Sequence, residues 1–92
     1  MLSPDRNGNG TQPEVVALQA LAWIVSDEMR GERLLSLTGM DAGQLRARAD
    51  DPAIWAAVLD FLAAHEPDLI ACAESLGLPP EALIHAAREI SQ

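Results

Sequence analysis

The 92-residue chain contains no lysine and no tyrosine, and it has a single cysteine. One cysteine, Cys72, cannot form an internal disulfide. The lack of tyrosine and the scarcity of β-branched residues argue against a β-sheet. No apolar run approaches the length of about 20 residues that a membrane-spanning helix needs, and no secretory leader is recognisable. We therefore expect a protein of the reducing cytoplasm.

Charge is also unevenly distributed. The net charge is −8 at pH 7, which disfavours nucleic acid and anionic membranes as partners, because both repel an anion. All cationic side chains are arginines, and the segment 30–48 concentrates Arg30, Arg33, Arg46 and Arg48. Guanidinium groups bind carboxylates and phosphates in bidentate fashion. These four residues form an arginine island. It could contact an acidic partner, or it could pair with the acids of its own domain.

The remaining composition is rich in alanine and leucine, which favour helices. The most distinctive segment is 51–65, where Asp51 is a suitable N-cap and Pro52 suits the first helical position. Apolar residues follow at helical spacing: Ile54, Trp55, Val58, Leu59 and Leu62. Alanines occupy most of the opposite face, with Asp60 as the one charge. We expect a nearly enclosed central helix that reaches water only along the strip marked by Asp60 and ends before Pro67.

Capping motifs and glycines divide the rest of the chain into segments. Residues 1–11 have little to bury and are predicted to form a disordered tail, whereas residues 12–92 form a single domain. A capping box beginning at Thr11 would start a first helix that runs to about Met29, and Gly31 would break it. The remaining predicted helices are 32–37, 41–49 with a second capping box, 68–76 and 81–90. The fold class is all-α, a small orthogonal bundle of five to six short helices around the central helix 51–65.

A tight helical corner occurs twice, at Gly39 and at Gly77. The second corner has the small-glycine-apolar pattern of DNA-binding helix-turn-helix proteins, with Ala73, Gly77 and Leu78. The helix that would enter the major groove then carries two glutamates, Glu81 and Glu89, which oppose binding to phosphates. A purely structural corner explains the same pattern.

Residues with catalytic or metal-binding chemistry are sparse. His65, Asp68 and Cys72 lie close together in the sequence, but Pro67 interrupts the helix that would align them. The chain contains neither a Cys-x-x-Cys nor a His-Glu-x-x-His spacing. No nucleophile–base pair and no phosphate-binding loop is recognisable. We predict that the protein is not an enzyme and uses no cofactor or metal.

Several short motifs resemble a known family. They are Leu-Thr-Gly at 37–39, Leu-Arg-Ala-Arg-Ala at 45–49, Asp-Pro at 51–52 and Leu-Gly-Leu-Pro-Pro-Glu at 76–81. Together they resemble a family of short bacterial proteins that is defined only as a domain of unknown function, over about residues 13–90. The resemblance implies a small all-helical bacterial protein of the cytoplasm. It implies no activity, cofactor or catalytic residue.

The first helix is apolar around much of its circumference, more than so short a chain is expected to cover. Such a helix lies in a core or has a partner on its far side. We therefore expect a non-catalytic helical protein-interaction module, with self-association as a homodimer as one form of that binding. The predicted contacts are Trp23 and the island of Arg30, Arg33, Arg46 and Arg48. The alternative is a helix-turn-helix-like regulator that binds nucleic acid.

Overall fold

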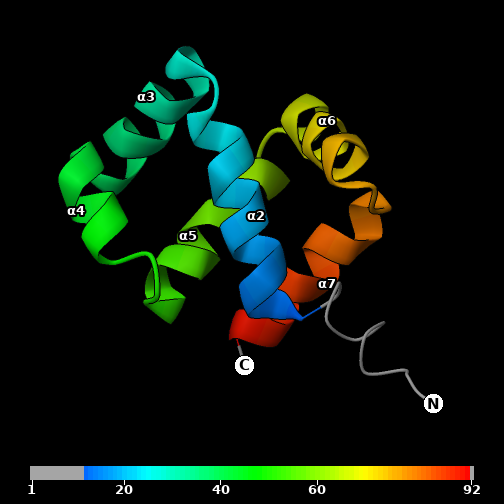
Figure 1. Ribbon diagram of the computed structural model, residues 1–92. Coiled ribbons are helices and arrows are strands. Elements are labelled where there is room, and N and C mark those ends of the chain that lie inside the picture. Colours follow the sequence, from blue (N-terminus) through cyan, green and yellow to red (C-terminus); the bar gives the residue numbers. More distant parts are fainter. Residues whose placement is uncertain (1–11, 92) are drawn as a thin grey trace.

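The computed structural model describes residues 12–91 and confirms the all-α bundle. The helices are α2 (Pro13–Val25), α3 (Glu28–Thr38), α4 (Ala42–Ala47), α5 (Pro52–Ala63), α6 (Glu66–Leu76) and α7 (Pro80–Ser91), and residues 12–91 contain no strand (Figure 1). Within this range, no helix is both long enough and apolar enough to cross a bilayer. The predicted tail, residues 1–11, and Thr11 of the predicted first capping box lie outside the described residues.

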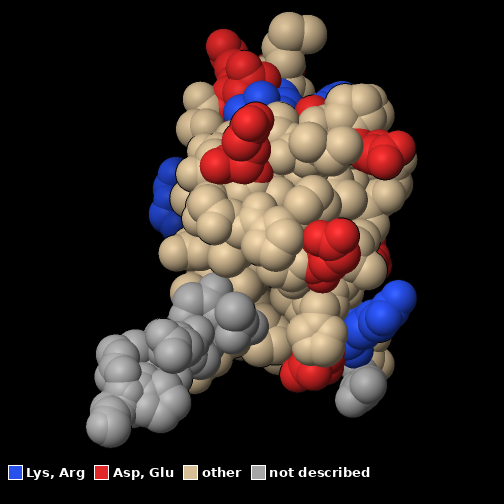
Figure 2. Space-filling model, turned by 90° about the vertical axis from the view of Figure 1, so that its right-hand side faces the viewer, with Lys and Arg blue, Asp and Glu red and all other residues tan. Residues whose placement is uncertain are grey.

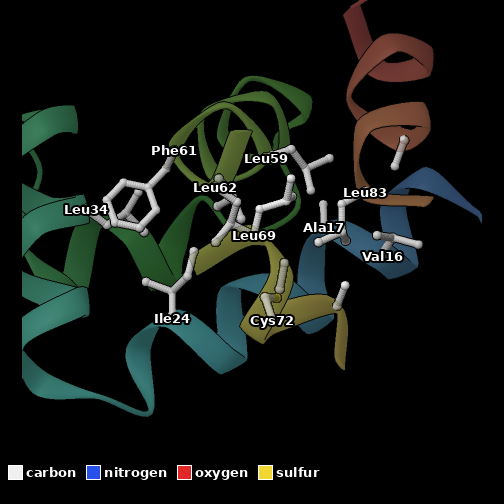
Figure 3. Close-up of a cluster of buried hydrophobic side chains, with 14 of the residues drawn as sticks. Val16, Ala17, Ile24, Leu34, Leu59, Phe61, Leu62, Leu69, Cys72 and Leu83 are labelled. Carbon is white, nitrogen blue, oxygen red and sulfur yellow. The ribbon is translucent and has the colours of Figure 1, made fainter. Parts of the chain in front are cut away.

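The core lies where α2, α5 and α7 cross one another (Figure 1). Helix α6 closes the core on one side, and Leu34 of α3 reaches it from the other. In Figure 3, Leu62 and Leu69 lie in the middle of this cluster, Phe61 and Leu34 at one end and Leu83 and Val16 at the other. The fully buried large side chains are Val16, Ile24, Leu34, Val58, Leu59, Leu62, Cys72 and Leu83.

Helix α5 begins as the sequence predicts. The Asp51 carboxylate accepts a hydrogen bond of 2.9 Å from the amide of Ala53, and Pro52 opens the helix. The end differs slightly, because α5 stops at Ala63 and His65 is already the N-cap of α6. Pro67 therefore lies inside the first turn of α6, where a missing N–H leaves no hydrogen bond unmade.

The central position of α5 is confirmed, but its exposed strip is wider than predicted. Ile54, Val58, Leu59, Phe61 and Leu62 are buried against the other helices. Exposed residues run along the other face of the helix: Ala53, Asp60 and Ala63. Ala53 and Ala63 therefore meet solvent, whereas Ala56 and Ala57 between them are half-buried.

The predicted boundary between the first two helices is wrong. Helix α2 ends at Val25, and the chain turns at Ser26 and Asp27. The Asp27 carboxylate then accepts a hydrogen bond of 3.0 Å from the amide of Arg30 and caps α3. Gly31 is not a break but a buried residue within α3, and a Cβ at Gly31 would lie 3.6 Å from the Cα of Val25. A side chain at this position would therefore be in ordinary van der Waals contact with the end of α2.

The two glycine corners and the second capping box are confirmed. Gly39 and Gly77 both have a φ of 73° and end α3 and α6 in the left-handed conformation. At α4, the Gln44 amide donates to the Asp41 carboxylate at 2.8 Å, and the Asp41 amide donates to the Gln44 side chain at 3.0 Å. The Gly39 corner turns the chain from α3 into α4, so it fixes one side of the groove described next.

Candidate interaction groove

Helices α2, α3 and α4 surround an apolar groove of about 420 Å³. Figure 1 shows α3 and α4 forming an arm that leaves α2 at its C-terminal end and returns to α5. Four leucines and three alanines supply much of the wall. The lining residues are Leu18, Leu21, Ala22 and Val25 of α2; Glu28, Gly31, Glu32 and Leu35 of α3; Ala42, Leu45 and Arg46 of α4; and Ala49.

The groove exists because α2 is apolar on two faces. One face, with Val16, Ala17, Ala20 and Ile24, is buried in the core. A second face lines the groove, and its residues Leu18 and Val25 remain 36% and 50% exposed. Large apolar side chains that stay half exposed next to one another are typical of a binding surface. Single exposed apolar residues scattered over a protein are not.

The spacing of this second face has a helical period. Leu18, Leu21, Ala22 and Val25 stand at positions i, i+3, i+4 and i+7 of α2. Leu18 and Val25 are therefore about 10 Å apart along the helix axis. This row and the leucines Leu35 of α3 and Leu45 of α4 together line the groove.

The rim of the groove carries charges of both signs. Glu28 and Glu32 lie near the corner where α3 leaves α2, and Arg46 lies on α4, beyond the other end of α3. All three side chains belong to exposed residues. Within residues 12–91, none of them takes part in an ion pair.

The other arginines of the predicted island make separate contacts. The Arg30 guanidinium stacks on the ring of Trp23, 3.6 Å from the ring centroid, and donates a hydrogen bond of 3.3 Å to the Trp23 carbonyl oxygen. Arg48 pairs with Asp51 at 3.0 Å. The structure thus brings Trp23 and Arg30 together but does not place either of them among the groove residues.

Arg33 connects α3 to α6. Its guanidinium donates to the Asp68 carboxylate at 2.6 Å, and the same carboxylate oxygen lies 3.2 Å from Nδ1 of His65. The guanidinium also lies over the Phe61 ring, 5.4 Å from its centroid. Arg33 and Arg48 therefore pair with acids of their own domain, which was one of the two alternatives for the island, and of the four arginines Arg46 alone lines the groove.

Sequence reasoning missed most of the groove residues. The sequence placed Leu18, Leu21, Ala22 and Val25 in the main apolar stripe of the first helix, and Val16 and Ile24 to its sides. The structure instead buries Val16 and Ile24 in the core and leaves the predicted stripe on the groove wall. The available signal was the width of the apolar surface on the first helix, because one core can cover only one side of a helix. The width of the apolar surface indicated that the far side of the first helix is covered, but it did not show which residues would line that contact.

The Gly77 corner joins α6 to α7, and the two helices contact each other. Leu78 tucks half-buried into the junction, and Leu83 and Ala86 of α7 are buried behind it. The exposed side of α7 presents Glu81, His85, Arg88 and Glu89. Figure 2 views the side of the molecule that is on the right in Figure 1, where α6 and α7 lie, and shows scattered acidic groups on a largely uncharged surface. This side offers phosphates no continuous basic surface.

The residues considered for metal binding do not form a site in the part of the chain that is described. No group of three His, Cys, Asp or Glu side chains within residues 12–91 could hold a metal ion. Cys72 is fully buried in the core, and burial raises the pKa of its thiol to about 11. A thiol with so high a pKa is a poor nucleophile at neutral pH.

Comparison with known proteins gives a family but no activity. No curated protein and no solved structure matches the chain. One protein family does match, over residues 10–92, and its description is "Protein of unknown function (DUF3572)". The match spans every helix described above and confirms the resemblance seen in the short motifs. The chain therefore belongs to the DUF3572 family.

Proposed function

We propose that the protein is a non-catalytic interaction module that holds an amphipathic helix of a partner protein in the groove between α2, α3 and α4. The observation that supports this proposal is the half-exposed row of Leu18, Leu21, Ala22 and Val25 on the wall of an apolar groove. Helix-in-groove binding uses apolar anchors at positions i, i+3 or i+4 and i+7 of the incoming helix. The groove wall presents the same period, so the two rows of side chains can interdigitate.

The chemistry of the groove favours binding over catalysis. Its titratable side chains are Glu28, Glu32 and Arg46, and all three belong to exposed residues. An active site would need an acid, base or nucleophile in contact with a bound substrate. Burial of the apolar groove surface against a partner would instead stabilise the complex, by about 25 cal/mol per Å² of apolar area.

A displayed library of peptides of about 16 residues, long enough for four helical turns, tests the proposal without knowledge of the natural partner. We expect enrichment of sequences with apolar residues at i, i+3 or i+4 and i+7. Synthetic copies of the enriched peptides should become helical when they bind, as measured by circular dichroism. No enrichment, or enrichment without this period, contradicts the proposal.

Two matched variants locate the binding surface. Val25 and Ile70 are 50% and 47% exposed, but only Val25 lines the groove. We expect Val25→Glu to weaken peptide binding by about ten-fold or more, because a carboxylate would lose water against an apolar helix. Ile70→Glu introduces the same charge elsewhere and should leave binding unchanged. Equal effects of the two substitutions would place the binding surface outside the groove.

A further inference from the structure

The charges on the groove rim specify which amphipathic helix fits. This inference rests on the proposed function, since it describes the occupant of the same groove. The acidic end of the groove, which carries Glu28 and Glu32, adjoins the corner between α2 and α3. The basic end carries Arg46 on α4. We propose that the occupant is a helix of another protein whose apolar stripe has basic residues at one end and acidic residues at the other.

The charged residues near the groove differ in whether they already have a partner within the fold. Arg33 and Arg48 already pair with Asp68 and Asp51, and Arg30 is stacked on Trp23. In contrast, Arg46, Glu28 and Glu32 make no ion pair within residues 12–91. The rim therefore keeps one cation and two anions that remain available to pair with an incoming helix.

The same charges also set the direction of the bound helix. Acidic residues in the first turn and basic residues in the last turn stabilise a helix through its macrodipole. A helix with this natural order has its basic C-terminal turn at Glu28 and Glu32, and its acidic N-terminal turn at Arg46. The side chains carry full charges whereas the helix termini carry about half a charge, so the side chains decide the direction.

A second copy of this chain fits the groove less well. The large apolar side chains that remain exposed elsewhere are Met29 and Leu37 on α3 and Ile70 on α6. Between Met29 and Leu37, at the i+4 position, lies Arg33, which is held by Asp68. Apart from the groove row on α2 itself, no described helix of this chain therefore offers an uninterrupted apolar stripe that is not already buried in the core.

Three synthetic peptides with the same apolar stripe test the proposal. One has acidic residues at its N-terminal end and basic residues at its C-terminal end, the second is basic at both ends, and the third is acidic at both ends. At about 0.15 M salt the Debye length is near 8 Å, so the overall charge of the protein contributes little beyond the nearest contacts. We expect the peptide with mixed ends to bind about two- to five-fold more tightly than either of the others, the range set by one exposed ion pair.

The variant Arg46→Glu gives the decisive result. It makes both ends of the groove acidic, so the preference should change to the peptide that is basic at both ends. The control is Arg88→Glu on α7, an exposed residue outside the groove that changes the net charge by the same amount. Arg88→Glu should keep the original order of the peptides. If both variants shift the order equally, the overall charge governs binding and the proposal is wrong.

The remaining outcomes separate this inference from the proposed function. Binding of all three peptides with equal affinity would leave the groove as a helix-binding site and overturn the charge assignment. Failure of all three to bind would overturn both. Sedimentation of the protein alone checks the self-association that the sequence suggested, and a dimer that the peptides dissociate would assign the groove to a second copy instead.

Discussion

The indole N–H of Trp55 donates a hydrogen bond of 2.7 Å to the carbonyl oxygen of Ala49. Ala49 lines the groove, and Trp55 packs half-buried against the core in the first turns of α5. The bond thus connects the end of the α3–α4 arm to the central helix. One side chain holds the groove wall to the core.

Replacing Trp55 should lower stability in two steps. Trp55→Phe retains an aromatic ring but removes the donor, and we expect a loss of about 1 kcal/mol in the free energy of unfolding. Trp55→Ala should cost about 2–3 kcal/mol, less than the truncation of a fully buried tryptophan, because water already reaches part of the ring. Urea denaturation followed by circular dichroism measures both. If Trp55→Phe is as stable as the wild type, the hydrogen bond does not hold the arm.

Gly77 ends α6 with a φ of 73°, and the amide of Leu78 donates back to the Ala73 carbonyl oxygen at 2.9 Å. A Cβ at Gly77 would meet no atom within 4 Å, so substitution there is strained only by the backbone conformation. We expect Gly77→Ala to lower the free energy of unfolding by about 1 kcal/mol. Gly77→Asn should cost less, because asparagine tolerates the left-handed conformation. Thermal unfolding of the two variants provides the comparison.

Gly31 is the matched control for this prediction. It lies within α3, and its added Cβ would be 3.6 Å from the Cα of Val25, an ordinary contact distance. Gly31→Ala should therefore be neutral or stabilising by up to about 1 kcal/mol, through helix propensity alone. A loss of stability at Gly31 similar to that at Gly77 would mean that the close packing of α2 and α3 requires glycine.

The sequence predicted those features that depend on a side chain and its neighbouring backbone. Asp41 and Asp51 cap helices and Gly39 and Gly77 end them, because each acts within a few residues. The turn between α2 and α3 was missed, although Asp27 followed by Glu28 is an N-cap signal. Apolar residues continue at helical spacing from α2 to Met29, so the pattern predicted one helix where the structure has a turn. Gly31 was misassigned because glycine favours a break, yet the N-cap at Asp27 and the packing of α3 against α2 keep it inside a helix.

The groove was harder to predict for a related reason. Leu18 and Val25 have the same apolar character as the buried Val16 and Ile24. Whether such a residue joins the core or lines a groove depends on whether another helix covers it, and that follows from the path of α3 and α4. The arginine island likewise looked like one surface, but Arg33 pairs across the fold with Asp68, which is 35 residues away.

The cap at Asp51 makes stability depend on acid pH. The hydrogen bond from the Ala53 amide, and then that from Arg48, hold the pKa of the Asp51 carboxyl below its ordinary value. This contribution is complete above the unfolded pKa, near 4, and is lost as the pH falls through the lower folded pKa. In Asp51→Asn the cap can still accept a hydrogen bond, but this acid-dependent loss should be absent.

Unfolding measured at several pH values between neutral and about 2.5, well below the ordinary aspartate pKa, tests this prediction. The informative quantity is the difference in stability between wild type and Asp51→Asn, because the other carboxylates titrate in both. The control is Asp60→Asn, at an exposed position on the same helix. A difference that stays constant with pH for Asp51→Asn would show that the cap does not depend on its charge.

At alkaline pH, Cys72 should dominate the stability of the protein. The chain has no lysine and no tyrosine, so Cys72 is the side chain that titrates between the ordinary thiol pKa of 9.0 and the folded value of about 11. The folded pKa is the higher one, because burial disfavours the thiolate. Over this range the unfolded chain loses the thiol proton while the folded chain keeps it. Stability should therefore fall as the pH rises from about 9 to about 11.

The variant Cys72→Ala removes the titrating group. It should be less stable than the wild type at pH 7, because the lost sulfur leaves a small cavity in the core, but its stability should stay level at alkaline pH. The two stability curves should therefore approach one another as the pH rises. In the wild type, an aromatic disulfide reagent should modify Cys72 only as fast as the core opens, since the side chain is 0% exposed. Parallel curves for the two proteins, or rapid modification of the native thiol, would contradict this account of Cys72.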